Sequence, residues 1–292
     1  MRDQIVHPSW LVESDWLAEN LDDPSLRIFD CTTFLRPDPV TTYRAQAGFQ
    51  EYCDGHIPGA AFIDLQADLS DPDSPLRFTM QNADDFAAAA GRLGIDAHSR
   101  VILYSQTSVQ WATRVWWLLR CFGFDNAAVL NGGLTKWQLE GRAVKSGIES
   151  YPTGVFVTAA RPGLMADSAE VNAHIGDENA RIINALSFEQ HTGTGGTAYG
   201  RPGRIAESRC VPTASLLDPE TGAFIDMATI SEAFDGVGAA KNKRIIAYCG
   251  GGIAASATAY VLTLLGHQNV AVYDNSLSEW ATDPSLPMAI GD

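Results

Sequence analysis

The same order of apolar segments occurs twice along the chain, and this repeat limits the possible folds more than any other sequence feature. In the first half, an apolar run at 101–105, a polar loop, a longer apolar segment at 112–122 and a second apolar run at 127–131 follow one another. The second half has these segments in the same order at 244–249, 254–265 and 270–274. A duplicated unit of this size predicts two similar domains in one chain.

Single residues keep the same spacing. Trp137 and Trp280 are 143 residues apart, whereas Tyr104 and Tyr248 are 144 apart. The loop after the first of these strands is therefore one residue longer in the first half. Weaker matches extend upstream, where the segment 55–59 corresponds to 203–207.

The segments predict alternating strands and helices. Short apolar runs bounded by turn residues are typical of buried parallel strands, and longer runs with a period of 3.6 are typical of helices. Strands are expected at 101–105, 127–131, 244–249 and 270–274, and helices at 83–93, 112–122, 168–175, 229–235 and 254–265. The fold class is therefore α/β, with two domains that each have a mainly parallel sheet and helices on both faces.

The stretch 145–165 separates the two domains. It contains Gly, Pro and Ser without a sustained apolar period, as expected of a connection between compact units. We therefore predict domains at 1–150 and 151–292.

Composition excludes several classes of function. The 292 residues include 20 Lys and Arg against 35 Asp and Glu, a net charge of −15, which disfavours general binding to nucleic acid or to an anionic membrane. The first ten residues lack the apolar core of a secretory signal, and the densest apolar run, 115–119, is too short to span a bilayer. We therefore expect a cytoplasmic protein.

The five cysteines are widely spaced and odd in number, which argues against a disulfide framework. The nearest approach to a metal motif is Cys53 with His56, and no second ligand pair has matching spacing. We predict no metal and no other cofactor.

Ligands of open α/β sheets bind beyond the carboxyl ends of the strands, where the second half has a distinctive loop. Cys249 ends the strand expected at 244–249 and is followed by three glycines and an apolar helix. Consecutive glycines allow backbone amides to point inward and form an anion-binding concavity, which a helix N-terminus reinforces. Cys249 is thus a candidate nucleophile. The alternative is a buried cysteine that packs as a small apolar residue.

These features together resemble the two-domain rhodanese family of sulfurtransferases. The resemblance covers nearly the whole chain. It rests on the tandem repeat and on four segments of the sequence, namely His56-Ile57-Pro58-Gly59-Ala60, Asn131-Gly132-Gly133-Leu134, Cys249-Gly250-Gly251-Gly252-Ile253-Ala254, and 273–280 (YDNSLSEW).

The resemblance implies that Cys249 carries a sulfane sulfur as a persulfide and that the first domain is non-catalytic. Ser105 stands at the position matching Cys249 and cannot carry sulfur, and its loop has no glycine. The loop residues Gly250, Gly251, Gly252, Ile253 and Ala254 would bind the substrate. In this family, basic residues commonly follow the cysteine when thiosulfate is the donor. Ser two positions after it is common when 3-mercaptopyruvate is the donor. Gly250 and Gly251 fit neither pattern.

The donor is anionic, and the loop at Cys249 supplies no positive charge. Arg201 and Arg204 lie in a glycine-rich segment of an acidic chain, and an arginine can donate two parallel hydrogen bonds to an oxyanion. We predict that Arg201 is the main contact with the donor and Arg204 a secondary one. The alternative is that both pair with surface carboxylates. His56 is interpreted as structural, and His191 is not assigned a proton-transfer role.

The predicted function is transfer of sulfur from a small anionic donor, thiosulfate or 3-mercaptopyruvate, to cyanide or a thiol. The thiol would be a small molecule or a thioredoxin-like protein. A cysteine phosphatase of the same general fold needs Arg after five intervening residues, where this chain has Ala255. A non-catalytic sulfur carrier or interaction module of the same fold remains the alternative.

Overall fold

A computed structural model describes residues 5–38, 42–197 and 199–291. In the first half, five strands form one parallel sheet in the order β1-β7-β6-β2-β5. Its strands are β1 (Leu11–Val12), β2 (Leu26–Asp30), β5 (Ala61–Phe62), β6 (Arg100–Tyr104) and β7 (Ala127–Leu130).

A second parallel sheet has the order β11-β9-β12-β13-β8. Its strands are β8 (Met165–Ala166), β9 (Ala180–Asn184), β11 (Arg209–Cys210), β12 (Arg244–Tyr248) and β13 (Val270–Tyr273). When β8 is matched with β1 and β12 with β6, the two strand orders are identical. The predicted duplication and the α/β fold class are both confirmed.

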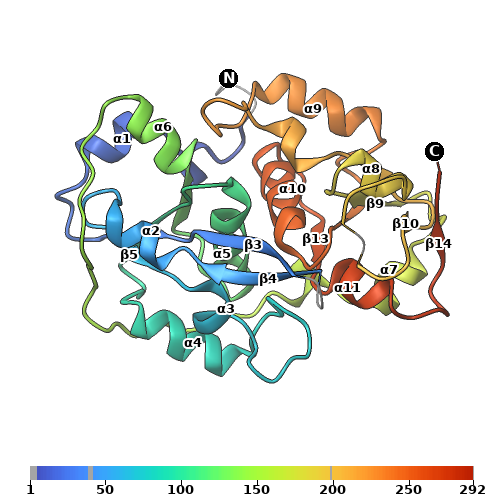
Figure 1. Cartoon of the computed structure of the whole chain (residues 1–292), viewed down its shortest axis with the longest axis horizontal. Helices are drawn as coiled ribbons and strands as arrows, with labels where there is room; N and C mark the ends of the chain where they lie inside the picture. Colours follow the sequence, from blue (N-terminus) through green and yellow to red (C-terminus); the bar gives the residue numbers. More distant parts are fainter. Residues whose placement is uncertain (1–4, 39–41, 198, 292) are drawn as a thin grey trace.

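Helices cover both faces of each sheet (Figure 1). Those of the first half are α1 (Ser14–Glu19), α2 (Phe49–Asp54), α3 (Leu65–Asp68), α4 (Ala83–Arg92), α5 (Val109–Cys121) and α6 (Gly133–Leu139). Those of the second half are α7 (Ser168–Ala173), α8 (Phe188–Thr192), α9 (Met227–Gly236), α10 (Ile253–Leu264) and α11 (Ser276–Trp280). The five helices expected from the sequence are all present.

Alternate residues of each central strand enter different cores. In β6, Val101 and Leu103 join a core shared by the two halves, whereas Ile102 and Tyr104 face an outer core with Trp137. Because both faces of these strands are buried, their sequences are continuous apolar runs without polar alternation. Trp280 has the matching place in the second half.

The two domains pack through equivalent helices, α5 and α10. The hydroxyl oxygens of Thr113 and Ser256, which are 143 residues apart, lie 3.1 Å from each other. Residues related by the repeat therefore meet across the interface, as expected near a pseudo-twofold axis. Trp116 and Tyr260 extend this contact, with ring centroids 4.8 Å apart.

The predicted connection at 145–165 is extended along most of its length and follows the first domain. The amide of Gly154 donates to the carbonyl of Gly91, and the amide of Arg161 donates to that of Cys121. These bonds hold the connection against α4 and α5, so the chain reaches β8 without a free linker.

Two small antiparallel pairs were not anticipated. β3 (Thr33–Asp38) pairs with β4 (Thr42–Ala47), and β10 (Arg204–Ile205) pairs with β14 (Met288–Ala289). The β3–β4 pair runs from the first domain towards α11 of the second (Figure 1). It brings first-domain side chains to the loop that follows β12.

No helix in the described part of the chain has the length and apolar character needed to cross a membrane.

Candidate active site

The cysteine loop begins directly after β12 and is held at both ends by one serine. Cys249 is 2% exposed, and its amide donates to Ser276 Oγ at 3.0 Å. The amide of Gly252 donates to the same oxygen at 3.2 Å, and this hydroxyl donates to the carbonyl of Tyr273. Ser276 has a φ of +50°, which is uncommon for a residue with a side chain. The loop geometry therefore depends on a side chain that follows the next strand.

Each loop glycine has a different surrounding. Gly252 has a φ of +74°, and a Cβ there would lie 2.6 Å from the carbonyl oxygen of Asp274. A Cβ at Gly250 would overlap the ring of Tyr199, which lies against the loop. A Cβ at Gly251 would meet only ordinary contacts, the nearest being Ser278 Oγ at 3.7 Å. Close approach of other atoms thus requires glycine at 250 and 252, whereas position 251 has room for a Cβ.

Cys249 lines a cavity of about 90 Å³ at the start of α10. Gly250, Gly251, Ile253 and Ala254 line it as well, so the structure brings four of the five predicted loop residues to the thiol, and Gly252 lies outside. The remaining walls are mainly aromatic and aliphatic and come from both domains: Leu35, Tyr43, Phe78, Gln110, Leu186 and Tyr199. Within the described part of the chain, the amides of Gly250 and Gly251 donate to no protein acceptor. They are available for an anion.

A second cavity of about 250 Å³ adjoins the first. Tyr43, Phe78, Tyr199 and Gly251 line both. Its other lining residues are Pro75, Leu76, Arg77 and Ser278. Sequence reasoning missed the first-domain residues here, because nothing local to them signals a contact with a cysteine far along the chain.

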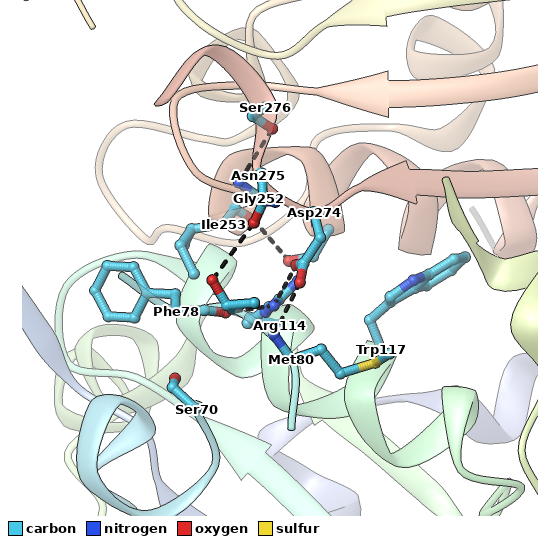
Figure 2. Close-up of polar contacts among 12 residues, drawn as sticks. Ser70, Phe78, Met80, Arg114, Trp117, Gly252, Ile253, Asp274, Asn275 and Ser276 are labelled. Carbon is cyan, nitrogen blue, oxygen red and sulfur yellow. Dashed lines mark hydrogen bonds and ion pairs between the residues drawn. The ribbon is translucent and has the colours of Figure 1, made fainter. Parts of the chain in front are cut away.

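An ion pair between the domains lies beneath the cysteine loop (Figure 2). Arg114 of α5 is fully buried, and its Nη2 lies 2.5 Å from Asp274 Oδ1 and donates to the carbonyl of Phe78 at 2.6 Å. The amide of Met80 donates to the other carboxylate oxygen at 2.8 Å. Asp274 thus joins the end of β13 to two segments of the first domain, next to Gly252.

Arg201 lies outside the lining of the cavity at Cys249. Its guanidinium donates to four backbone carbonyls at the end of α11 and just beyond it: Trp280, Ala281, Asp283 and Leu286. It lines another hollow, which shares Leu186 and Tyr199 with the cavity at Cys249 but does not include the cysteine. Arg201 thus stabilises a turn of the chain through backbone carbonyls. Among the described residues it forms no ion pair with a carboxylate, so the alternative of surface pairing does not apply to it.

Arg204 also lies outside the lining of the cysteine cavity. It belongs to β10, and its Nη1 donates to the carbonyl of Gly291. Burial, followed by the charges of Arg204 and Arg209, lowers the pKa of the nearby His191 to about 4. The prediction that Arg204 contacts the donor therefore has no support from this geometry.

The matching loop of the first domain is closed. Ser105 borders a space of only about 10 Å³. Side chains fill the place that glycines leave open in the second domain: Gln106 donates to Asp30, and its amide donates to Thr32 Oγ1. A space of this size is at the lower limit for a single water.

The histidines are placed as structural residues. His56 is buried, stacks on Tyr52 and forms a 2.9 Å hydrogen bond with that residue's carbonyl. The ring of His191 pairs with Asn184. Among the described residues, no three His, Cys, Asp or Glu side chains gather where they could hold a metal ion.

Comparison with known families decides the family. The model of the rhodanese-like domain matches residues 13–140 and 167–283. The chain belongs to the rhodanese family. Each matched segment contains four of the five strands of one sheet and leaves out only an edge strand, β1 or β8, so this rhodanese carries the domain twice.

Similar proteins are sulfurtransferases. This rhodanese is 33% identical to the 3-mercaptopyruvate sulfurtransferase of Escherichia coli over 96% of this chain and 98% of that one. It is 32% identical to thiosulfate/3-mercaptopyruvate sulfurtransferase 2 of Arabidopsis thaliana, over 95% of this chain and 86% of that one. The crystal structure of E. coli SseA superposes with a TM-score of 0.78 at 33% identity, covering 92% of this chain and 99% of that one. Sulfur transfer is therefore the activity of this rhodanese.

Proposed function

We propose that sulfur passes through a persulfide on Cys249. The observation that carries this proposal is a free cysteine that lines a cavity, next to the first turn of α10 and to two glycine amides that have no acceptor among the described residues. Amides and a helix N-terminus both favour negative charge on the sulfur.

The other four cysteines are poorer candidates for the nucleophile, because three have a raised pKa and the fourth lies outside the cavities. Burial raises the pKa of Cys121 and of Cys210 to about 12, and it raises the pKa of Cys31 well above its usual range. These three remain thiols at neutral pH. Cys53 lies on α2, away from the cavities described above.

Two half-reactions balance without a cofactor. The Cys249 thiolate attacks the outer sulfur of thiosulfate, the new S–S bond forms, and sulfite leaves with the electron pair of the broken bond. With 3-mercaptopyruvate, the C–S bond breaks and the enolate of pyruvate leaves and takes up a proton. An acceptor thiolate then attacks the outer sulfur of the persulfide and releases the Cys249 thiolate. Ping-pong kinetics follow.

The loop amides stabilise the charge that moves onto the outer sulfur. Each hydrogen bond to a charged group is worth about 1.5–3 kcal/mol. The backbone amides of Gly250 and Gly251 therefore donate hydrogen bonds that a polar side chain would otherwise have to donate.

The two domains have different roles in this proposal. Residues 151–292 form the catalytic domain, and residues 1–150 form a domain that performs no chemistry. The closed loop at Ser105 supports this division.

The donor is thiosulfate or 3-mercaptopyruvate, as the names of the relatives suggest, and the acceptor is a small thiol or a thioredoxin-like protein. One relative is named sulfur carrier protein TtuD, from Thermus thermophilus, at 29% identity over 98% of both chains. A carrier without turnover is thus the second candidate. A cytoplasmic location is supported by the five cysteines, all free.

Mass spectrometry after donor treatment tests the proposal. The peptide with Cys249 should gain about 32 Da, as covalent transfer of one sulfur requires, and Cys249→Ser should abolish both the gain and turnover. Cys53→Ser is the matched control and should keep wild-type turnover. Sulfur on any other cysteine, with Cys249 unmodified, would overturn the assignment. Loading without turnover in the presence of thiols would favour the carrier.

A further inference from the structure

We propose that the first-domain loop between Ser70 and Met80 forms the outer wall of the active site, and that Arg77 binds the anionic group of the sulfur donor. The proposal rests on the proposed role of Cys249 and names the class of donor that this site accepts.

Arg77 is the cation of the two adjoining cavities. Of the described residues that line them, it alone has a permanently charged side chain. Its guanidinium lies 5.3 Å from the ring centroid of Tyr43 and forms no ion pair within the described part of the chain. An unpaired arginine is notable in a protein with a net charge of −15. It is available to an anion in the outer cavity.

Tyr43 links this arginine to the thiol. It lines both cavities, and its ring packs against Tyr199 with centroids 5.9 Å apart. Burial raises the pKa of Tyr43 and a hydrogen bond with Tyr199 lowers it, while a negative charge on Cys249 raises it and Arg77 lowers it. The same phenol therefore lies within electrostatic range of both the thiolate and the guanidinium.

Contacts from both domains hold the loop in place. An isolated antiparallel bridge joins Ser70 to Met80 and closes the loop at its base. Phe78, next to Arg77, has a φ of +63°, and its carbonyl accepts from buried Arg114. The amide of Met80 donates to Asp274 (Figure 2). Backbone strain of this kind persists only where surrounding contacts enforce it, and it concentrates at functional sites.

The inner cavity is mainly apolar and the outer cavity has a cation, and this difference indicates which donor the site accepts. The inner cavity has mainly aromatic and aliphatic walls, with Gln110 as the one polar side chain among the described lining residues, whereas the cation borders the outer cavity. Burying a charge away from its partner is costly. The site therefore fits a donor whose carboxylate is separated from the transferable sulfur by a short uncharged unit, with the sulfur at Cys249 and the carboxylate at Arg77.

Steady-state kinetics of Arg77→Ala and Arg77→Lys test this assignment, with 3-mercaptopyruvate as the donor. Loss of one charge-assisted contact should lower kcat/KM roughly 10- to 100-fold in the alanine variant, through KM, with kcat at saturation changed less than about threefold. The lysine variant should lie between the two. Arg44→Ala is the matched control, because Arg44 follows Tyr43 on β4, is exposed and lines neither cavity. It should keep wild-type kinetics.

Two readouts separate this inference from the proposed function. The wild-type kcat/KM should fall as ionic strength rises, and that of Arg77→Ala should fall much less. Sulfur loading of Cys249 at saturating donor should be complete in both proteins. Loading with an unchanged KM in Arg77→Ala would overturn the role of Arg77 and leave Cys249 in place. A wild-type protein that fails to load Cys249 would overturn the proposed function itself.

Discussion

The buried ion pair between Arg114 and Asp274 joins the domains directly beneath the cysteine loop, and neutralising one partner should destabilise the protein strongly. Asp274→Asn keeps the size of the side chain and its contact with the Met80 amide but removes the charge. Arg114 then remains fully buried without a counterion.

The magnitude follows from burial. Removing one partner of a buried ion pair costs about 3–5 kcal/mol, whereas an exposed pair is worth about 0–1 kcal/mol. Arg114→Met should cost less than Asp274→Asn, because it also removes two guanidinium nitrogens, Nε and Nη1, that lack hydrogen-bond partners in the described structure. The double variant should cost less than the sum of the two, since it leaves no unpaired charge.

Urea unfolding followed by tryptophan fluorescence measures these costs, with Lys145→Met as the matched control. Lys145 pairs with Glu149 at 2.6 Å, but its side chain is 59% exposed, so its loss should cost less than about 1 kcal/mol. Equal costs for Asp274→Asn and Lys145→Met would refute the argument from burial. Additive effects in the double variant would show that the two charges are not coupled.

Three further predictions concern other parts of the site. Ser105→Ala should leave kcat/KM within about threefold, and a hundredfold loss in a folded protein would assign chemistry to the first domain. Gly250→Ala should push the Tyr199 ring aside, so its effect on kcat/KM should be non-additive with Tyr199→Ala; additivity would contradict the contact. Unfolded histidine binds a proton near pH 6.5 but folded His191 only near pH 4, so its contribution is complete above about pH 6.5 and is lost as pH falls towards 4. His191→Gln should flatten that part of the stability curve by up to roughly 3 kcal/mol, and an unchanged curve would argue against a buried neutral ring.

Local patterns of the sequence were enough to predict the fold and to locate the loop that contains Cys249. The repeat predicted two equivalent sheets, because apolar periodicity and turn residues act over a few neighbouring positions. The strand, cysteine, glycines and helix around Cys249 likewise predicted a cavity with loop amides, since all four features are consecutive in the chain.

The source of positive charge depended on tertiary structure. Arg201 and Arg204 were chosen because they lie in a glycine-rich segment, but backbone carbonyls of the second domain occupy Arg201. Arg77 was passed over because it lies 172 residues before Cys249 and in the other domain. Sequence proximity does not report which side chain faces a cavity.

The residues that form the walls of the cavity also depend on the tertiary structure. Tyr43 reaches the cysteine loop on the β3–β4 pair, and Tyr199 covers Gly250 from another loop. The placement of Tyr43 at the cavity requires the docking of α5 on α10, whereas Tyr199 reaches Gly250 within the second domain. The sequence by itself determined that Cys249 follows a strand and precedes three glycines and a helix, because these features are consecutive in the chain. Only the tertiary structure decided what holds this loop and what surrounds the thiol, because Ser276, Tyr199 and Tyr43 lie far from Cys249 in the sequence.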